Sequence, residues 1–181
     1  MAREFNGSSD VIKYTLAAGQ TSLTQISFSF YIYPDTNPQY KASFTQGDDY
    51  PNGDMALEFD DGWGYVFQAY RGTGDNTGGK WSIAKPATGQ WSQIVLTYDW
   101  GDIANDPIFY LNGVSQGITE RQAPGAGSVR NTSTKFAIGS AYDTQNSGGV
   151  FDWRIAEFGI WNRILTSAEA AALGKGFSPK F

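Results

Sequence analysis

The sequence contains neither cysteine nor histidine. Without cysteine, the chain has no disulfide, no thiolate nucleophile and no thiolate ligand for a metal. Without histidine, the triads of serine and cysteine hydrolases, histidine general-base catalysis and histidine-ligated zinc are all excluded. Any catalysis by this protein would therefore rest on carboxylates, lysine or tyrosine.

Positive charge is also scarce, because 13 Lys and Arg stand against 18 Asp and Glu, giving a formal net charge of −5. Nucleic-acid-binding domains normally carry a basic stripe. None is visible, so we expect no nucleic-acid partner. No apolar run approaches the roughly 20 residues of a transmembrane helix, and we expect no membrane insertion. Residues 1–7 carry no hydrophobic signal segment, which favours a protein made and used inside a cell, with a removed leader as the alternative.

Aromatic residues and glycine are abundant. The 181 residues include 6 Trp, 10 Tyr, 12 Phe and 22 Gly. Aromatic strands separated by glycine turns are typical of an all-β sandwich. The length suits one domain with a full core. No linker or internal repeat divides the chain, so we predict a single domain over residues 1–181.

Alternating segments predict the strands. Ser22–Tyr33 carries apolar side chains at every second position and ends at Pro34. Met55–Phe59 and Trp63–Tyr70 are joined by Asp-Asp-Gly, and Asp-Gly between alternating runs is a strong hairpin signal. Gly72–Lys80 shows no periodicity, which predicts a glycine-rich loop.

The longest apolar stretch lies near the C-terminus. Residues Val150–Arg163 are apolar at both parities, which predicts a strand packed on both faces. Thr166 and Glu169 have the spacing of a helix capping box, alanine-rich sequence follows, and Gly174 stands where a C-cap glycine belongs. The pattern predicts a buried strand that runs into a short helix.

This stretch resembles the C-terminal signature of laminin G-like, concanavalin A-like jelly-roll domains. The matching residues are Ile155, Glu157, Phe158, Ile160, Trp161, Asn162, Arg163, Leu165, Ala168 and Glu169. Four more blocks follow the family pattern in the same order, at 5–12, 22–34, 89–113 and 136–139. The resemblance implies an antiparallel two-sheet jelly roll with one short C-terminal helix. It also implies that the C-terminal strand lies centrally and pairs with an N-terminal strand.

The same fold hosts glycoside hydrolases, whose motif places Glu, Asp and Glu at alternate positions of one strand. Here Glu58 and Asp60 share a face, but Gly62 occupies the third position. We interpret the chain as non-catalytic, with a glycoside hydrolase or lyase as the less favoured alternative.

Calcium is the one cofactor that the resemblance suggests. At the positions of the usual family site this chain has Trp153 and Ala156, which offer no carboxylate. A second candidate is the acidic loop with Asp48, Asp49 and Asp54, since carboxylates suit a hard cation. The alternative is an acidic loop that is merely solvated.

Sugar sites place an aromatic ring against the apolar side of a pyranose and add polar hydrogen-bonding groups. Trp63 and Trp100 stand at turns beside glycine and acids, so they are the first candidates, with Asp99 next to Trp100. Tyr50 and Tyr142 are weaker candidates. The alternative is that each ring closes an end of the sandwich. The other four tryptophans are expected in the core: Trp81, Trp91, Trp153 and Trp161.

The expected function is a non-catalytic carbohydrate-binding or adhesion module whose partners are glycans or cell-surface polysaccharide. The tail at 173–179 resembles laminin G-like proteins of phage and prophage genomes. Together with the initiator Met, this predicts a capsid decoration or fibre protein located on the virion, in contact with phage capsid proteins and able to form homo-oligomers. The alternatives are a purely structural virion protein without glycan binding and an extracellular protein.

Overall fold

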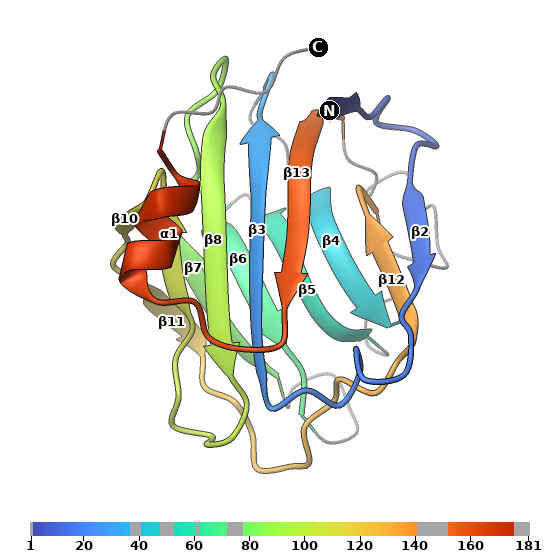
Figure 1. The fold of residues 1–181 in the computed structure, drawn as a ribbon, viewed down its shortest axis with the longest axis vertical. Coiled ribbons are helices and arrows are strands. Elements are labelled where there is room, and N and C mark those ends of the chain that lie inside the picture. Colours follow the sequence, from blue (N-terminus) through green and yellow to red (C-terminus); the bar gives the residue numbers. More distant parts are fainter. Residues whose placement is uncertain are drawn as a thin grey trace.

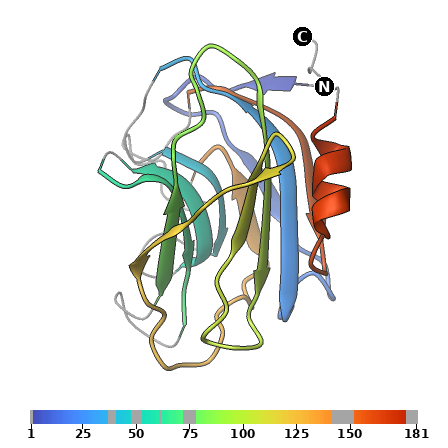
Figure 2. The same cartoon turned by 90° about the vertical axis from the view of Figure 1, so that its left-hand side faces the viewer.

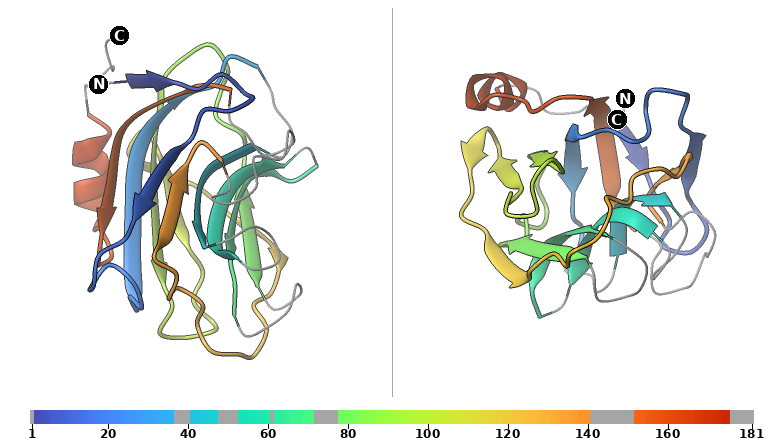
Figure 3. Two further views of the ribbon diagram at one scale, coloured as in Figure 1. Left: turned by 90° about the vertical axis from the view of Figure 1, so that its right-hand side faces the viewer. Right: turned by 90° about the horizontal axis from the view of Figure 1, so that it is seen from below.

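The structure, a computed structural model, describes residues 2–36, 41–47, 53–60, 62–71, 78–140 and 152–175. Two antiparallel sheets pack face to face (Figure 1). Seen from below, one short helix lies on the outer side of the six-stranded sheet (Figure 3). The predicted all-β jelly-roll sandwich with a C-terminal helix is confirmed. Within the described ranges, no helix is long and apolar enough to span a membrane.

The six-stranded sheet has the order β1-β13-β3-β8-β9-β10. Its strands are β1 (Ala2–Glu4), β3 (Gln25–Tyr33), β8 (Ser92–Asp99), β9 (Ile108–Leu111), β10 (Val114–Ser115) and β13 (Arg154–Trp161). The C-terminal strand β13 pairs with the N-terminal β1 on one side and with β3 on the other. This is the pairing that the family resemblance implied.

The seven-stranded sheet has the order β11-β7-β6-β5-β4-β12-β2. Its strands are β2 (Ile12–Thr15), β4 (Lys41–Gly47), β5 (Gly53–Asp60), β6 (Gly64–Ala69), β7 (Gly79–Ile83), β11 (Thr119–Gln122) and β12 (Lys135–Ile138). The predicted β5–β6 hairpin is confirmed. Gly79 and Lys80, predicted in a loop, lie in β7, which begins earlier than the periodicity indicates. Residues 72–77 of that predicted loop lie outside the described ranges.

Alternation in β3 builds the core as expected. Its alternate residues from Ile26 to Ile32 are at most 4% exposed. Across the sandwich, the rings of Phe28 in β3 and Phe44 in β4 lie with their centroids 4.4 Å apart. Aromatic rings from both sheets thus meet in the space between them and bury apolar surface there.

A bulge explains why the C-terminal strand is apolar at both parities. The register of β13 against β3 shifts between Ala156 and Gly159, and Glu157 adopts a φ of 54°. As a result Phe158 stacks on Phe30 in the core, with centroids 5.3 Å apart, although its parity differs from that of buried Ile155. The predicted strand is present but shorter than expected: β13 starts at Arg154, residues 152–153 are not in a strand, and residues 150–151 lie outside the described ranges.

The helix α1 (Ser167–Leu173) has the predicted capping box. The pKa of Glu169 is lowered to about 2, because Arg163 and both the amide and the hydroxyl of Thr166 bind its carboxylate. The helix packs on the outer face of the six-stranded sheet, with a small buried cluster consisting of Val95, Tyr110, Leu165 and Ala170 and, at its edge, Trp161. Trp161 is therefore half-buried outside the main core, and Trp91 is also only half-buried, whereas Trp81 and Trp153 are core residues as predicted.

Candidate functional site

The turn between β5 and β6 presents a tryptophan to solvent. Asp60 Oδ1 accepts hydrogen bonds from the backbone N–H groups of Gly62 (2.9 Å) and Trp63 (3.0 Å), which fixes the turn. Gly64 then takes a φ of 105°, a conformation that favours glycine. Trp63 is 39% exposed, so a large part of its indole is accessible. The sequence-based candidate Trp63 thus has the exposure that a sugar platform requires.

A shallow pocket of about 430 Å³ opens beside this turn. We call it the Trp63 pocket. It is lined by the turn itself, by the end of β7 and residues 84–85, and by Gly117, Thr119 and Arg121 in and before β11. Trp63, Lys85 and Arg121 are its large side chains. The pocket is therefore built at one end of the seven-stranded sheet, from three segments that are distant in sequence.

Arg121 links the edge strand β11 to the β5–β6 turn through hydrogen bonds. Its Nε donates to Ser82 Oγ (2.9 Å) in β7, and its Nη2 donates to the carbonyl oxygen of Trp63 (3.3 Å). Lys80 Nζ lies over the Trp63 ring, 5.8 Å from its centroid. The Lys80 ammonium thus lies above the indole of Trp63, and the Arg121 guanidinium is hydrogen-bonded to the backbone carbonyl of the same residue. These two cations favour electron-rich or anionic groups in the pocket.

A polar row continues from Trp63 along the outer face of the same sheet. Gln68 Nε2 donates to Glu58 Oε1, and Tyr70 O–H donates to Gln68 Oε1 (2.7 Å). The strand register places Gln68 opposite Lys80. Burial raises the pKa of Glu58 to about 7; the charge of Lys80 opposes this rise and that of Asp60 adds to it. Glu58 is thus a carboxyl group that keeps its proton to a higher pH than an ordinary glutamate does.

Trp100 has to be corrected as a sugar-binding candidate. The residue does stand at a turn, but it is only 1% exposed and packs on Tyr98, with centroids 4.9 Å apart. Arg71 Nη2 donates to its carbonyl oxygen (2.8 Å). A ring that the protein covers cannot stack on a sugar, so Trp100 closes one end of the sandwich, which was the alternative expectation.

Asp99, predicted beside Trp100, is engaged within its own turn. Its Oδ1 accepts from the N–H of Gly101 (2.7 Å), and its Oδ2 accepts from Gln25 Nε2 (2.9 Å). This turn follows β8 in the lower part of Figure 2, whereas the teal β5–β6 hairpin projects to the left above mid-height. The structure therefore does not bring Asp99 and Trp63 together. Tyr50 and Tyr142 lie outside the described residues.

Of the three predicted calcium ligands, the structure describes only Asp54. That residue is 5% exposed in β5, and its Oδ2 accepts from the N–H of Ser133 (2.7 Å). Asp48 and Asp49 lie outside the described residues. In the part of the chain that the structure describes, no three His, Cys, Asp or Glu side chains gather in a way that could hold a metal ion. Calcium binding stays a prediction.

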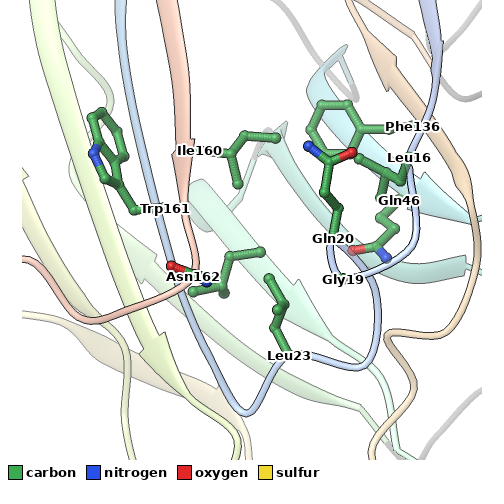
Figure 4. Close-up of a pocket in the computed structure, with 10 residues that line it drawn as sticks. Leu16, Gly19, Gln20, Leu23, Gln46, Phe136, Ile160, Trp161 and Asn162 are labelled. Atoms are coloured by element: carbon green, nitrogen blue, oxygen red, sulfur yellow. The ribbon is translucent and has the colours of Figure 1, made fainter.

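A second pocket, of about 270 Å³, opens between the two sheets at another edge (Figure 4). Leu16, Leu23, Phe136 and Ile160 form its apolar walls, and Ile160 is 40% exposed there. Gln20, Gln46 and Asn162 add amide groups. None of the described residues that line it is charged. It is a candidate for an apolar group, and it lies apart from the polar row around Trp63.

Sequence patterns alone single out neither Arg121 nor the two lysines near Trp63. Their proximity depends on the register of β11 on β7 and of β7 on β6, which no local pattern encodes. One feature of the polar row could be read from the sequence. Alternation along each strand of the hairpin places Gln68 and Glu58 on the face opposite to the core.

Comparison with known families gives one match. The model for the concanavalin A-like lectin/glucanases superfamily matches residues 6–171. Among curated proteins, none matches the chain in sequence at a significant level.

Solved structures of low sequence identity share the fold. The heptameric SAP-like pentraxin of Limulus polyphemus is 13% identical, with a TM-score of 0.66 over 99% of this chain and 84% of its own. Domain 4 of AbnA, a GH43 extracellular arabinanase of Geobacillus stearothermophilus solved with arabinotriose, is 21% identical, with a TM-score of 0.68 over 96% and 76%. The CBM40 of Ruminococcus gnavus IT-sialidase, solved with α2,6 sialyllactose, is 15% identical, with a TM-score of 0.62 over 96% and 98%.

Proposed function

The chain belongs to the concanavalin A-like lectin/glucanases superfamily, and from this premise we propose that it is a non-catalytic carbohydrate-binding module. The observation that carries the proposal is the exposed indole of Trp63 beside a polar pocket of about 430 Å³. Two of the similar structures were solved with sugars, arabinotriose and sialyllactose, which supports the same class of ligand.

The chemistry of the Trp63 pocket suits a sugar ring. An indole offers a flat apolar surface for the C–H groups of a pyranose, while charged and hydroxyl side chains bind its oxygens. Here the donors are Arg121 and Lys85, and Thr119 adds a hydroxyl. Tryptophans at the centre of binding sites commonly contribute about 2 kcal/mol or more, so loss of Trp63 is expected to weaken binding roughly 30-fold.

The test is a glycan array on the wild type and on Trp63→Ala. Tyr14→Ala is the matched control, because Tyr14 is also an exposed aromatic residue (52%) but stands in β2 at the opposite edge of the sheet. We expect the wild type and the control to bind a shared set of glycans and Trp63→Ala to lose them. An array that stays silent for folded wild type, or a Trp63 variant that binds as the wild type does, would contradict the proposal.

Glu58 is the observation that favours a second candidate, a glycoside hydrolase. Such enzymes use one carboxyl group whose pKa is raised and a second carboxylate across the scissile bond. The pKa of Glu58 is about 7. The acid on the same face, Asp60, is hydrogen-bonded to two backbone amides of the turn. Release of reducing sugar from any glycan that binds, abolished in Glu58→Gln, would replace the non-catalytic proposal with this one.

Calcium and the virion setting are separate proposals. Calcium bound by the loop of Asp48, Asp49 and Asp54 would make glycan binding sensitive to a chelator. Glycan binding that EDTA leaves unchanged would contradict the calcium proposal.

The virion setting is supported by the resemblance of the tail at 173–179 to phage proteins. An antibody against the module is expected to label purified phage particles, whereas recovery only from the particle-free fraction would contradict that setting.

A further inference from the structure

We infer that the glycan bound at the Trp63 pocket is acidic, and that Lys85 and Arg121 bind its carboxylate groups. The inference rests on the proposed function and extends it, because it names the chemical class of the ligand. The sugars that fit are uronic acids and other carboxylated sugars, as a terminal residue or along a polysaccharide.

The charge of the pocket is opposite to that of the protein. Ten described residues line it, of which Lys85 and Arg121 are cationic and none is acidic. Lys80 Nζ lies just beside it, over the Trp63 ring. The protein as a whole has a net charge of −5. A local cationic site on an acidic protein attracts anionic ligands, while the acidic remainder of the surface repels them.

The two cations that line the pocket are not neutralised by the described residues. The ion pairs among these residues involve Arg3, Arg154 and Arg163, and neither Lys85 nor Arg121 forms one. The two described bonds of Arg121 go to a neutral hydroxyl and a neutral carbonyl. They orient the guanidinium and use two of its five N–H donors, which leaves three for a ligand.

The described acidic residues near the pocket either bind other groups or stand on the other face of their strand. Asp60 Oδ1 accepts the amides of Gly62 and Trp63. Glu58 Oε1 accepts from Gln68, farther along the sheet. Glu120 pairs in register with Trp81, whose side chain points into the core, whereas the pocket residue Thr119 pairs with Ser82 on the outer face. Asp61, the neighbour of Asp60 in sequence, lies outside the described residues.

The experiment compares each acidic glycan with its neutral counterpart by isothermal titration calorimetry. The probes are polygalacturonate against the same polymer with its carboxyl groups reduced to alcohols, and α2,6-sialyllactose against lactose. Dextran sulfate against dextran tests for any polyanion. Each titration is run on the wild type, on Lys85→Gln/Arg121→Gln, and on a control pair, Lys13→Gln/Lys175→Gln. The control removes the same charge from exposed residues, one of them in β2 at the far edge of the sheet.

We expect at least one carboxylated probe to bind roughly tenfold or more tightly than its neutral counterpart, since charge-assisted bonds are about twice as strong as neutral ones. The Lys85→Gln/Arg121→Gln variant should lose that preference, and the control variant Lys13→Gln/Lys175→Gln should keep it. Equal binding of an acidic probe and its neutral form would overturn the inference while leaving the proposed function intact. Equal binding of dextran sulfate and the carboxylated probes would also overturn it. No binding to any probe, with the glycan array silent as well, would instead remove the proposed function.

Discussion

Replacing Glu58 by Gln is expected to remove a penalty that folding incurs at neutral and alkaline pH. Glu58 is half-buried on the outer face of β5, and its Oε1 accepts a hydrogen bond from Gln68 Nε2. Burial is the main reason why its pKa rises from an ordinary 4.5 to about 7. The folded protein therefore binds the proton of Glu58 more tightly than the unfolded chain does.

The sign of the effect follows from this difference. The contribution of Glu58 to stability is fully present below pH 4.5 and is lost as the pH rises through about 7. Each pH unit between the two pKa values is worth about 1.4 kcal/mol, so the loss has an upper limit of about 3 kcal/mol. Gln has nearly the same size and keeps an oxygen that accepts from Gln68, but it does not ionise.

Urea unfolding of the wild type and Glu58→Gln at pH 4.5, 6, 7 and 8 measures this directly. We expect nearly equal stability at pH 4.5 and a variant that is more stable by about 2–3 kcal/mol at pH 8. Glu120→Gln is the control, because Glu120 is an exposed glutamate of β11, and it should give no such trend. A stability difference between wild type and Glu58→Gln that does not change with pH would show that folding does not raise the pKa of Glu58.

Two further predictions concern the frame that holds the site. Thr166→Ala removes the side chain that caps α1 and should lower the free energy of unfolding by about 1 kcal/mol, while Thr166→Ser should restore most of it; equal stability of all three proteins in urea would show that the cap contributes nothing. Phe44→Ala empties a position between the sheets and should cost about 3–5 kcal/mol. A loss below about 1 kcal/mol by the same measurement would mean that the sandwich core is packed differently.

The fold could be predicted because its signals are local. Alternation from Ile26 to Ile32 indicated one buried face, and the capping box of Thr166 and Glu169 located the helix. Asn-Gly favours a tight hairpin turn with two positive φ angles, and Asn112 and Gly113 form such a turn with φ values of 52° and 76°. The family pattern supplied what local signals lack, namely that β13 pairs with β1 and β3.

The irregular parts could not be predicted from periodicity. The bulge at Glu157 turns Phe158 into the core, so counting by twos across it assigns the wrong face. The exposure of a turn tryptophan is likewise a tertiary property. Trp63 and Trp100 have similar glycine and acid neighbours, yet Trp63 is 39% exposed and Trp100 is 1% exposed, because Trp100 packs on Tyr98 in the core.

The cationic lining of the Trp63 pocket depends on register between strands. Lys85 follows the end of β7, and Arg121 lies at a register shift between β11 and β7. The two are brought to one pocket because β7 pairs with both β6 and β11. Such pairing is set by the whole core and not by the residues that line the pocket.

The most direct test of carbohydrate binding at Trp63 is an NMR titration that follows the six tryptophan indole N–H signals, using a glycan that the array identifies. We expect the Trp63 signal to move with glycan concentration, while the signals of the buried Trp81, Trp100 and Trp153 stay in place. A titration that moves the signal of Trp161, which lines the second pocket, and leaves that of Trp63 unchanged would contradict it.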